Sequence, residues 1–155
     1  MLVDFDTLPD SSRIWVYSSK IPLEDKEKRY IIKHISDHLQ NWSAHKVPLT
    51  AGVKILEDYF IVVALDESKN LASGCSIDTL QNKIQEIEEE LSVSLLSRLN
   101  IFCRIEDIIK CIASYKLGEG IDKDTLFYDL TIQKKGDLSS WLKPIKEGWC
   151  ANLIS

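Results

Sequence analysis

A cysteine at position 75 stands between a glycine and a serine, just ahead of a segment with the periodicity of an amphipathic helix. The first turn of a helix carries unpaired N–H groups and a partial positive charge, which lower the pKa of a thiol and activate it. The same N–H groups can bind a phosphate or carboxylate, and Gly74 would let a ligand approach the backbone. Cys75 is therefore a candidate nucleophile, with Ser73 and Ser76 supplying hydroxyl groups nearby.

The turn that holds Cys75 has other interpretations. Asp78 places a carboxylate near the same N–H groups and could occupy them. A purely structural turn is the simplest alternative, with Gly74 at a positive φ angle and Cys75 buried as a small apolar side chain. The sequence thus leaves three interpretations open: a structural turn, a reactive thiol, and a turn that binds an anion or another ligand.

The three histidines are candidate partners for the thiol or for a metal ion. His45 follows the first predicted helix and could orient or deprotonate Cys75 if the fold brings the two together. His34 and His38 are four residues apart, a spacing that can chelate a metal on one helix face, but no third ligand is evident. We therefore expect no metal site and no cofactor, and we interpret His34 and His38 as residues at the solvent edge of the helix.

The composition is that of a folded protein of 155 residues, with 45% hydrophobic and 28% charged residues. A net charge of −5 disfavours nucleic-acid binding, which needs a clustered basic face. The start of the chain lacks the pattern of a signal peptide, and no apolar run approaches the roughly 18 residues of a spanning helix. We expect a cytoplasmic protein with no membrane association and with four free cysteines.

Hydrophobic periodicity predicts the elements that must position these residues. Runs with high β propensity predict strands at residues 13–19, 51–57, 59–66 and 100–105. The second and third of these strands form a hairpin around Glu57 and Asp58. Apolar residues at helical spacing predict one helix from Pro22 to about Trp42 and another that Asp78 caps. The order β-α-β-β-α-β is that of a ferredoxin-like α+β sandwich.

The predicted organisation is a single domain with three parts. Residues 1–11 form a loose leader, residues 13–105 form the α+β core, and residues 106–155 form an α/β extension packed on it. In the extension, Asp107 should begin a short helix, a strand should follow at residues 126–132, and Asp137 should begin a terminal helix.

Several motifs occur together in a fixed order along the chain. They are SRIWVY near the start, W-x-A-H-x-x-P-L-x-A at Trp42–Ala51, ASGCSID at Ala72–Asp78, RLN at Arg98–Asn100, and Trp141, Pro144 and Trp149 near the end. With these motifs the chain resembles, over residues 12–150, an uncharacterised bacterial family labelled "ABC transporter ATPase". The resemblance implies that the 42–51 loop and the 73–78 turn share one site.

The family label implies nucleotide hydrolysis, but the sequence has no P-loop, no G-x-G-x-x-G and no G-x-S-x-G motif. Two functions remain as hypotheses. One is a binding or interaction module that recognises a small ligand or a protein partner through Trp42, Ser73, Gly74, Ser76 and Asp78. The other is a thiol-dependent enzyme or redox sensor in which Cys75 attacks and His45 assists. A homodimer formed through an exposed sheet face is expected by analogy with the fold alone.

Overall fold

The computed structural model describes residues 1–118 and 120–154, and the chain forms two compact units. The first unit comprises Met1–Leu96 together with Gln133–Gly136, and the second comprises Ser97–Ile132 and Asp137–Ser155. The expected organisation, a core ending at residue 105 with an extension packed on it, differs from this division. The chain leaves the first unit at Leu96, before the last strand that the sequence had assigned to the core.

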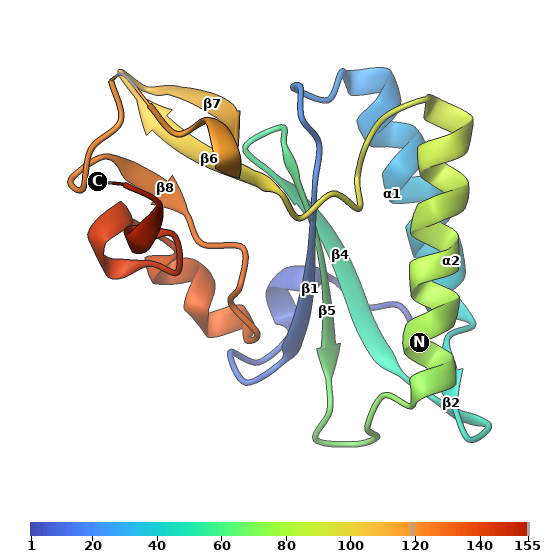
Figure 1. Cartoon of the computed structure of the whole chain (residues 1–155). Helices are drawn as coiled ribbons and strands as arrows, with labels where there is room; N and C mark the ends of the chain where they lie inside the picture. The colour runs from blue at the N-terminus through green and yellow to red at the C-terminus, as the bar shows by residue number, and fades with distance from the viewer. Residues whose placement is uncertain (119, 155) are drawn as a thin grey trace. The chain divides into compact units, whose positions relative to one another are not determined.

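A three-stranded antiparallel sheet forms the centre of the first unit, in the order β1-β5-β4 (Figure 1). Its strands are β1 (Arg13–Ser18), β4 (Thr50–Leu56) and β5 (Phe60–Asp66). Every residue of β5 except the last is buried. This confirms the prediction of a central strand, which was made from the almost continuous apolar run.

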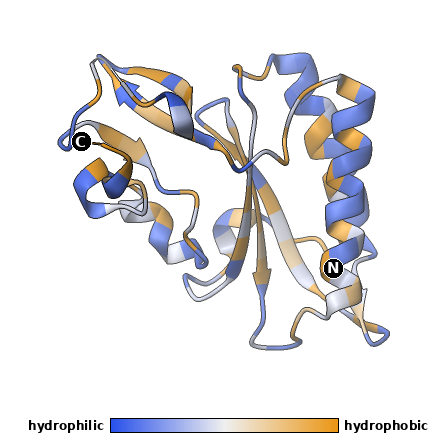
Figure 2. Cartoon of the chain, in the orientation of Figure 1, coloured by the Kyte–Doolittle hydropathy of each residue, from blue (hydrophilic) through white to orange (hydrophobic). Residues whose placement is uncertain are grey.

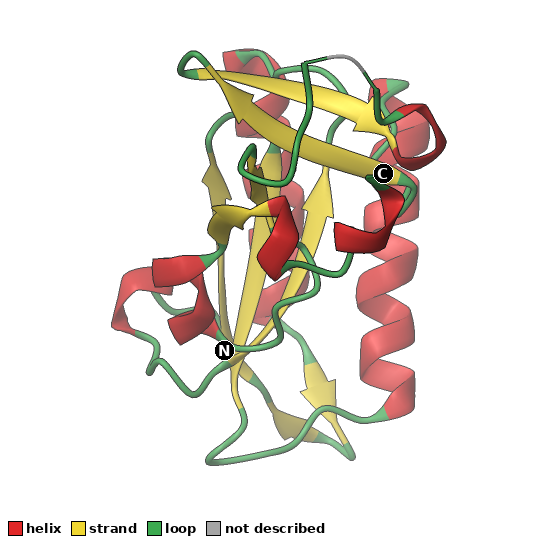
Figure 3. Ribbon diagram, turned by 60° about the vertical axis from the view of Figure 1, so that its left-hand side comes forward, coloured by secondary structure: helices red, strands yellow, loops and turns green. Residues whose placement is uncertain are grey.

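Two helices, α1 (Asp25–Gln40) and α2 (Gly74–Leu91), lie side by side on one face of this sheet (Figures 1 and 3). Their apolar stripes meet over β5 in one buried cluster that includes Ile31, Ile35, Leu39, Leu80, Ile84, Ile87, Ile61, Val63 and Leu65. Much of the rest of both helix surfaces is hydrophilic (Figure 2). In the described parts of the chain, no helix has the length and apolar character needed to cross a membrane.

The α+β class is confirmed, but the ferredoxin-like topology is not. Strand β6 (Asn100–Ile105) does not join the first sheet; it belongs to a second sheet with the order β7-β6-β8-β9. The other strands are β7 (Ile108–Ala113), β8 (Leu126–Tyr128) and β9 (Leu142–Pro144). This sheet has its own buried cluster, formed by Ile101, Cys103, Phe127, Ile145 and Cys150.

The second unit differs from the prediction mainly at β7, which replaces the helix expected after Asp107. Glu106 and Asp107 form a two-residue turn with φ angles of 52° and 64°, and β7 pairs with β6 directly after it. The isoleucine-rich run of β7 favours extended backbone, and this preference outweighs the capping signal. The strand expected at residues 126–132 is shorter, and the expected terminal helix is the 3-10 helix Lys135–Ser140 followed by β9.

Residues 1–11 are not a loose leader. The Val3 N–H donates a hydrogen bond of 2.9 Å to the Ala51 carbonyl, so the start of the chain lies along β4. Gly52 permits this close approach, because a Cβ atom there would lie 2.7 Å from the Val3 carbonyl oxygen. Phe5 and Leu8 are both buried. The burial of these two side chains holds residues 1–11 against the rest of the first unit. The proline and serines of this segment are typical of a loop, which is why the sequence predicted a loose leader.

Candidate functional site

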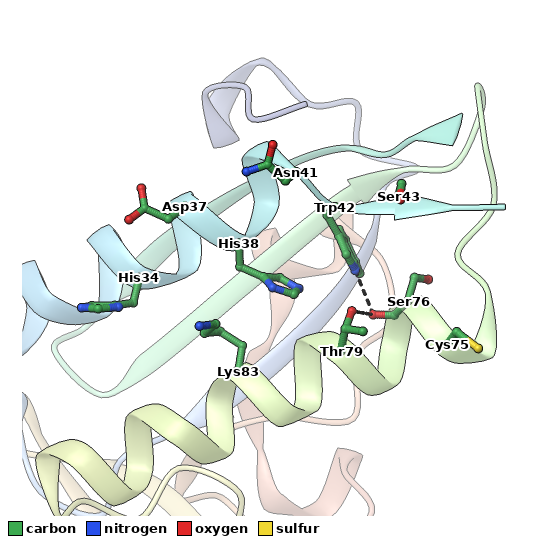
Figure 4. A pocket seen from close by; sticks show the side chains of 10 residues that line it. All are labelled: His34, Asp37, His38, Asn41, Trp42, Ser43, Cys75, Ser76, Thr79 and Lys83. Atoms are coloured by element: carbon green, nitrogen blue, oxygen red, sulfur yellow. Dashed lines mark hydrogen bonds between the residues drawn. The ribbon is translucent and has the colours of Figure 1, made fainter. Parts of the chain in front are cut away.

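A cleft of about 530 Å³ lies between the second half of α1 and the first half of α2 (Figure 4). It belongs entirely to the first unit. Most of its lining residues have polar side chains; the lining consists of His34, Asp37, His38, Asn41, Trp42, Ser43, Cys75, Ser76, Thr79 and Lys83.

The lining residues form one stripe on each helix. The stripe on α1 follows the spacing i, i+3, i+4, i+7 and consists of His34, Asp37, His38 and Asn41. The stripe on α2 follows the spacing i, i+3, i+7 and consists of Ser76, Thr79 and Lys83. Residues at these intervals share one face of a helix. Because the neighbouring apolar stripes pack together on the sheet, the two polar stripes face each other across the cleft.

A hydrogen bond between two distant segments closes one end of the cleft. The indole Nε1–H of Trp42 donates to the carbonyl oxygen of Ser76 at 2.8 Å, across 34 residues of sequence. The Thr79 hydroxyl donates to the same carbonyl at 2.8 Å. The Trp42 ring is buried and packs edge-on against Trp15, with the ring centroids 5.8 Å apart. The segment around Trp42 and the start of α2 therefore meet in space, as a shared site requires.

The start of α2 lies about one turn earlier than the sequence predicts. The Ser73 side-chain oxygen accepts from the Ser76 N–H at 3.1 Å, and the Ser76 side-chain oxygen accepts from the Ser73 N–H at 2.8 Å. These two bonds form a capping box in which serine replaces the usual glutamate or glutamine. The cap predicted at Asp78 is wrong, because Asp78 lies inside the helix and is exposed.

Cys75 is exposed, and Gly74 has no special backbone role. Gly74 lies in the helix without a positive φ angle, and a Cβ atom added there would meet nothing within 4 Å. The structural interpretation, with a buried Cys75 and a left-handed Gly74, is therefore wrong. The thiol lies at the end of the cleft near Ser76 (Figure 4).

His45 lies outside the cleft. It begins a two-residue turn between β2 (Ser43–Ala44) and β3 (Val47–Pro48), and it is exposed there with a φ angle of 52°. Within residues 1–118 and 120–154, no hydrogen bond or ion pair joins His45 to Cys75. The geometry gives the pairing of these two residues no support.

The structure brings together only part of the predicted site. Trp42, Cys75 and Ser76 line the cleft, whereas Ser73, Gly74 and Asp78 do not. From the sequence, His34 and His38 were interpreted as residues at the solvent edge of the helix, and the rest of the lining was not identified: Asp37, Asn41, Ser43, Thr79 and Lys83. The spacing of these residues on each helix was visible in the sequence, but a polar stripe beside an apolar one is also the normal solvent edge of a helix.

His38 is the most perturbed group of the cleft. Its ring is half-buried, and its Nε2 atom is buried without a hydrogen-bond partner in the described structure. Burial is the main cause that lowers the pKa of His38; the nearby Lys83 ammonium lowers the pKa further, and Glu86 opposes the shift. The imidazole is therefore neutral at pH 7. The residues described include no group of three or more side chains placed to hold a metal ion.

Comparison with known proteins gives the chain no relative. No family model, curated protein or solved structure matches it. The function must be inferred from the geometry of the cleft.

Proposed function

We propose that the protein is a binding module whose cleft between α1 and α2 takes a small polar ligand. The observation that carries the proposal is the convergence of two polar helix stripes on one cleft, whose lining includes His38, a residue with a buried Nε2 atom that lacks a hydrogen-bond partner in the described structure. Ligand pockets usually occupy about 300–1,000 Å³ and contain a few polar groups that orient the ligand. The volume of about 530 Å³ and the convergent side chains agree with this description.

The charges around the cleft favour a small ligand over a large polyanion. Lys33 and Asp37 form an ion pair of 3.1 Å, and Lys83 and Glu86 form one of 3.0 Å. In each pair the positive charge of the lysine is balanced by a carboxylate. The cleft therefore lacks the extended positive surface that nucleic acids require. The Asn41 amide and the hydroxyl groups of the lining can both donate and accept hydrogen bonds.

An NMR screen tests the proposal. Mixtures of amino acids, organic acids, sugars and nucleotides are added to ¹⁵N-labelled protein while the Trp42 indole signal and the Cys75 and Thr79 amides are recorded. We expect at least one compound to shift these signals in a saturable manner, with Ile108 of the second unit unchanged. A screen in which no compound moves the cleft signals would contradict the proposal.

A matched pair of variants links the binding to the cleft. Thr79 and Gln81 are both exposed on α2, but only Thr79 lines the cleft. Thr79→Arg should fill the cleft and abolish binding, whereas Gln81→Arg adds the same charge on the opposite side of the helix and should leave binding unchanged. Equal loss in both variants would show that the ligand binds elsewhere.

Thiol chemistry is the second candidate function, and the exposure of Cys75 at the end of the cleft favours it. His38 lines the same cleft as Cys75, whereas His45 does not, so His38 replaces His45 as the candidate base. Cys75→Ser separates the two functions. A pure binding module keeps its affinity in this variant, whereas a thiol enzyme stops converting the ligand while it still binds it.

A further inference from the structure

We propose that the cleft receives an anionic group of its ligand, a carboxylate or a phosphate, between His38 and Lys83, and that His38 takes up a proton from solvent when the anion binds. This inference rests on the proposed binding function and names the chemistry of the ligand.

The first argument is geometric. His38 on α1 and Lys83 on α2 both extend into the cleft between the two helices (Figure 4). The His38 Nε2 atom is buried without a partner in the described structure, and the Lys83 side chain is only 28% exposed. An anionic oxygen in the cleft would accept one hydrogen bond from the Lys83 ammonium and, once the His38 ring turns its buried Nε2 atom toward the cleft, a second one from the imidazolium. Bonds of this kind between charged groups are about twice as strong as neutral ones.

The second argument comes from the charged groups that face His38. On α1 these are His34, whose ring lies 4.0 Å from that of Tyr30, and Asp37, which is paired with Lys33. On α2 they are Lys83 and Glu86, which are paired with each other.

The surroundings of His38 therefore disfavour the imidazolium form. Burial and the Lys83 ammonium both act against it, and Glu86 only partly compensates. A bound anion would offset the charge of Lys83 and accept a hydrogen bond from protonated His38. Both effects raise the pKa of His38, so binding and proton uptake are coupled.

The turn at the start of α2 is a weaker anion site than this pair. Its capping box already occupies the Ser76 N–H, which donates to the Ser73 side chain at 3.1 Å. One interpretation of the sequence was an anion bound at the start of this helix. The structure favours a position about two turns further along α2, beside Lys83.

Titration of the three histidine rings by NMR tests the inference. The ring C–H signals are followed against pH in sodium chloride, sodium acetate and sodium phosphate at constant ionic strength. We expect acetate or phosphate to raise the pKa of His38 by about one unit, which corresponds to about tenfold tighter anion binding by the protonated form. His45, which lies outside the cleft, serves as the internal reference, and its pKa should not change. No shift at His38, or an equal shift at all three rings, would overturn the inference.

The comparison of acetate with phosphate identifies the anion class. A shift with acetate alone indicates a carboxylate ligand, and a shift with phosphate alone indicates a phosphorylated one. Either result supports the binding of an anionic group beside His38 and Lys83.

Two lysine variants check the partner of His38. Lys83→Gln should raise the pKa of His38 in the unliganded protein and should remove at least half of the shift that the anion causes. Lys26→Gln removes the same charge from an exposed position near the start of α1, outside the cleft, and should keep the full shift. Equal losses in the two variants would overturn the inference, because they would indicate general charge screening.

The same measurements separate this inference from the proposed function. If neutral compounds shift the Trp42 indole signal while neither anion affects His38, the cleft binds ligands and only the anion site is wrong. If no compound and no anion perturbs the cleft, both proposals fail.

Discussion

Cys75 and Cys103 carry the same thiol in opposite environments. Cys75 is exposed at the end of the cleft, whereas Cys103 is fully buried in β6. Burial, together with the neighbouring Cys150, raises the pKa of Cys103 to about 11. Burial also raises the pKa of Cys150. The environment of each sulfur, which the residue type does not reveal, therefore decides its chemistry.

This difference predicts the order in which the cysteines react with iodoacetamide. At pH 8 about one Cys103 thiol in a thousand would be ionised, and burial blocks the reagent as well. Peptide mass spectrometry should show rapid labelling of Cys75 and labelling of Cys103 and Cys150 only on unfolding. Cys75→Ser should remove the rapid phase. Labelling of Cys103 at the rate of Cys75 would show that the second unit opens readily.

At the scale of elements, the end of α2 depends on one residue of an acidic run. The Glu88 carboxylate accepts hydrogen bonds from the N–H groups of Leu95 and Leu96, at 2.6 and 2.9 Å. Ser92 ends the helix in the left-handed region, with a φ angle of 53°. From the sequence alone, the run of Glu86 to Glu90 is an ordinary solvated helix face. The structure gives Glu88 a separate role in holding the segment that follows the helix.

Glu88→Ala should therefore destabilise the protein by about 1–3 kcal/mol, because two backbone donors lose a charged acceptor. Urea denaturation measures the effect. Glu89→Ala, at an exposed position of the same run, is the matched control and should change stability by less than about 0.5 kcal/mol. Equal effects would mean that net charge, and not the hydrogen bonds of Glu88, is responsible.

Three hairpins have uncommon residues in their turns. The pairs His45–Lys46, Glu57–Asp58 and Glu106–Asp107 all have positive φ angles at both residues. Two-residue turns of this geometry favour Asn-Gly, because left-handed backbone strains most other residues. The predicted hairpin around Glu57 and Asp58 is correct. Its turn type could not be assigned, since the residues that normally indicate it are absent.

Replacing Glu106–Asp107 by Asn-Gly should stabilise the protein by about 1 kcal/mol, because it relieves left-handed strain in the β6–β7 turn. Asp107 is 98% exposed and lies 3.9 Å from Arg104, so little is lost when its carboxylate is removed. Replacement by Gln-Ser removes the same two charges without the turn preference. A gain of stability in the Gln-Ser variant as large as that in Asn-Gly would assign the effect to charge.

For the whole molecule, two partly buried groups contribute to acid stability, one in each unit. In the second unit, burial alone would raise the pKa of Asp129, but hydrogen bonds from Thr131 and Lys143 outweigh it and hold the pKa below its usual value. In the first unit, the pKa of His38 is lowered. Both folded pKa values lie below the unfolded ones, so both groups contribute stability that is lost as the pH falls.

The two groups should act in separate pH windows. The contribution of His38 is complete above its unfolded pKa of 6.5 and is lost as the pH falls through the lower folded value. The contribution of Asp129 is complete above 3.8 and is lost below it. Urea titrations at a series of pH values give the free energy of unfolding as a function of pH. In this curve, His38→Gln should flatten the fall that begins near pH 6.5, and Asp129→Asn should flatten the fall below pH 3.8. If each variant shifted stability equally at all pH values, ionisation would not be the cause.

The sequence by itself determined the features that a single element can encode. The apolar stripes of α1 and α2, the buried run of β5 and the β4–β5 hairpin all follow from local periodicity. Within the site, Trp42, Cys75 and Ser76 were identified from the sequence and do line the cleft. Each of these features depends on residues close together in the chain.

Only the tertiary structure decided how the elements pair. Strand β6 joined a second sheet because β7, which the sequence had assigned to a helix, pairs with it across a tight turn. His38 and Lys83 lie on different helices, and each has the appearance of an ordinary solvent-edge residue in the sequence. Their chemistry depends on burial and on the charge opposite, which exist only once α1 and α2 pack together on the sheet. Local periodicity indicates which face of a helix is buried, but the long-range contacts between helices decide what that face meets.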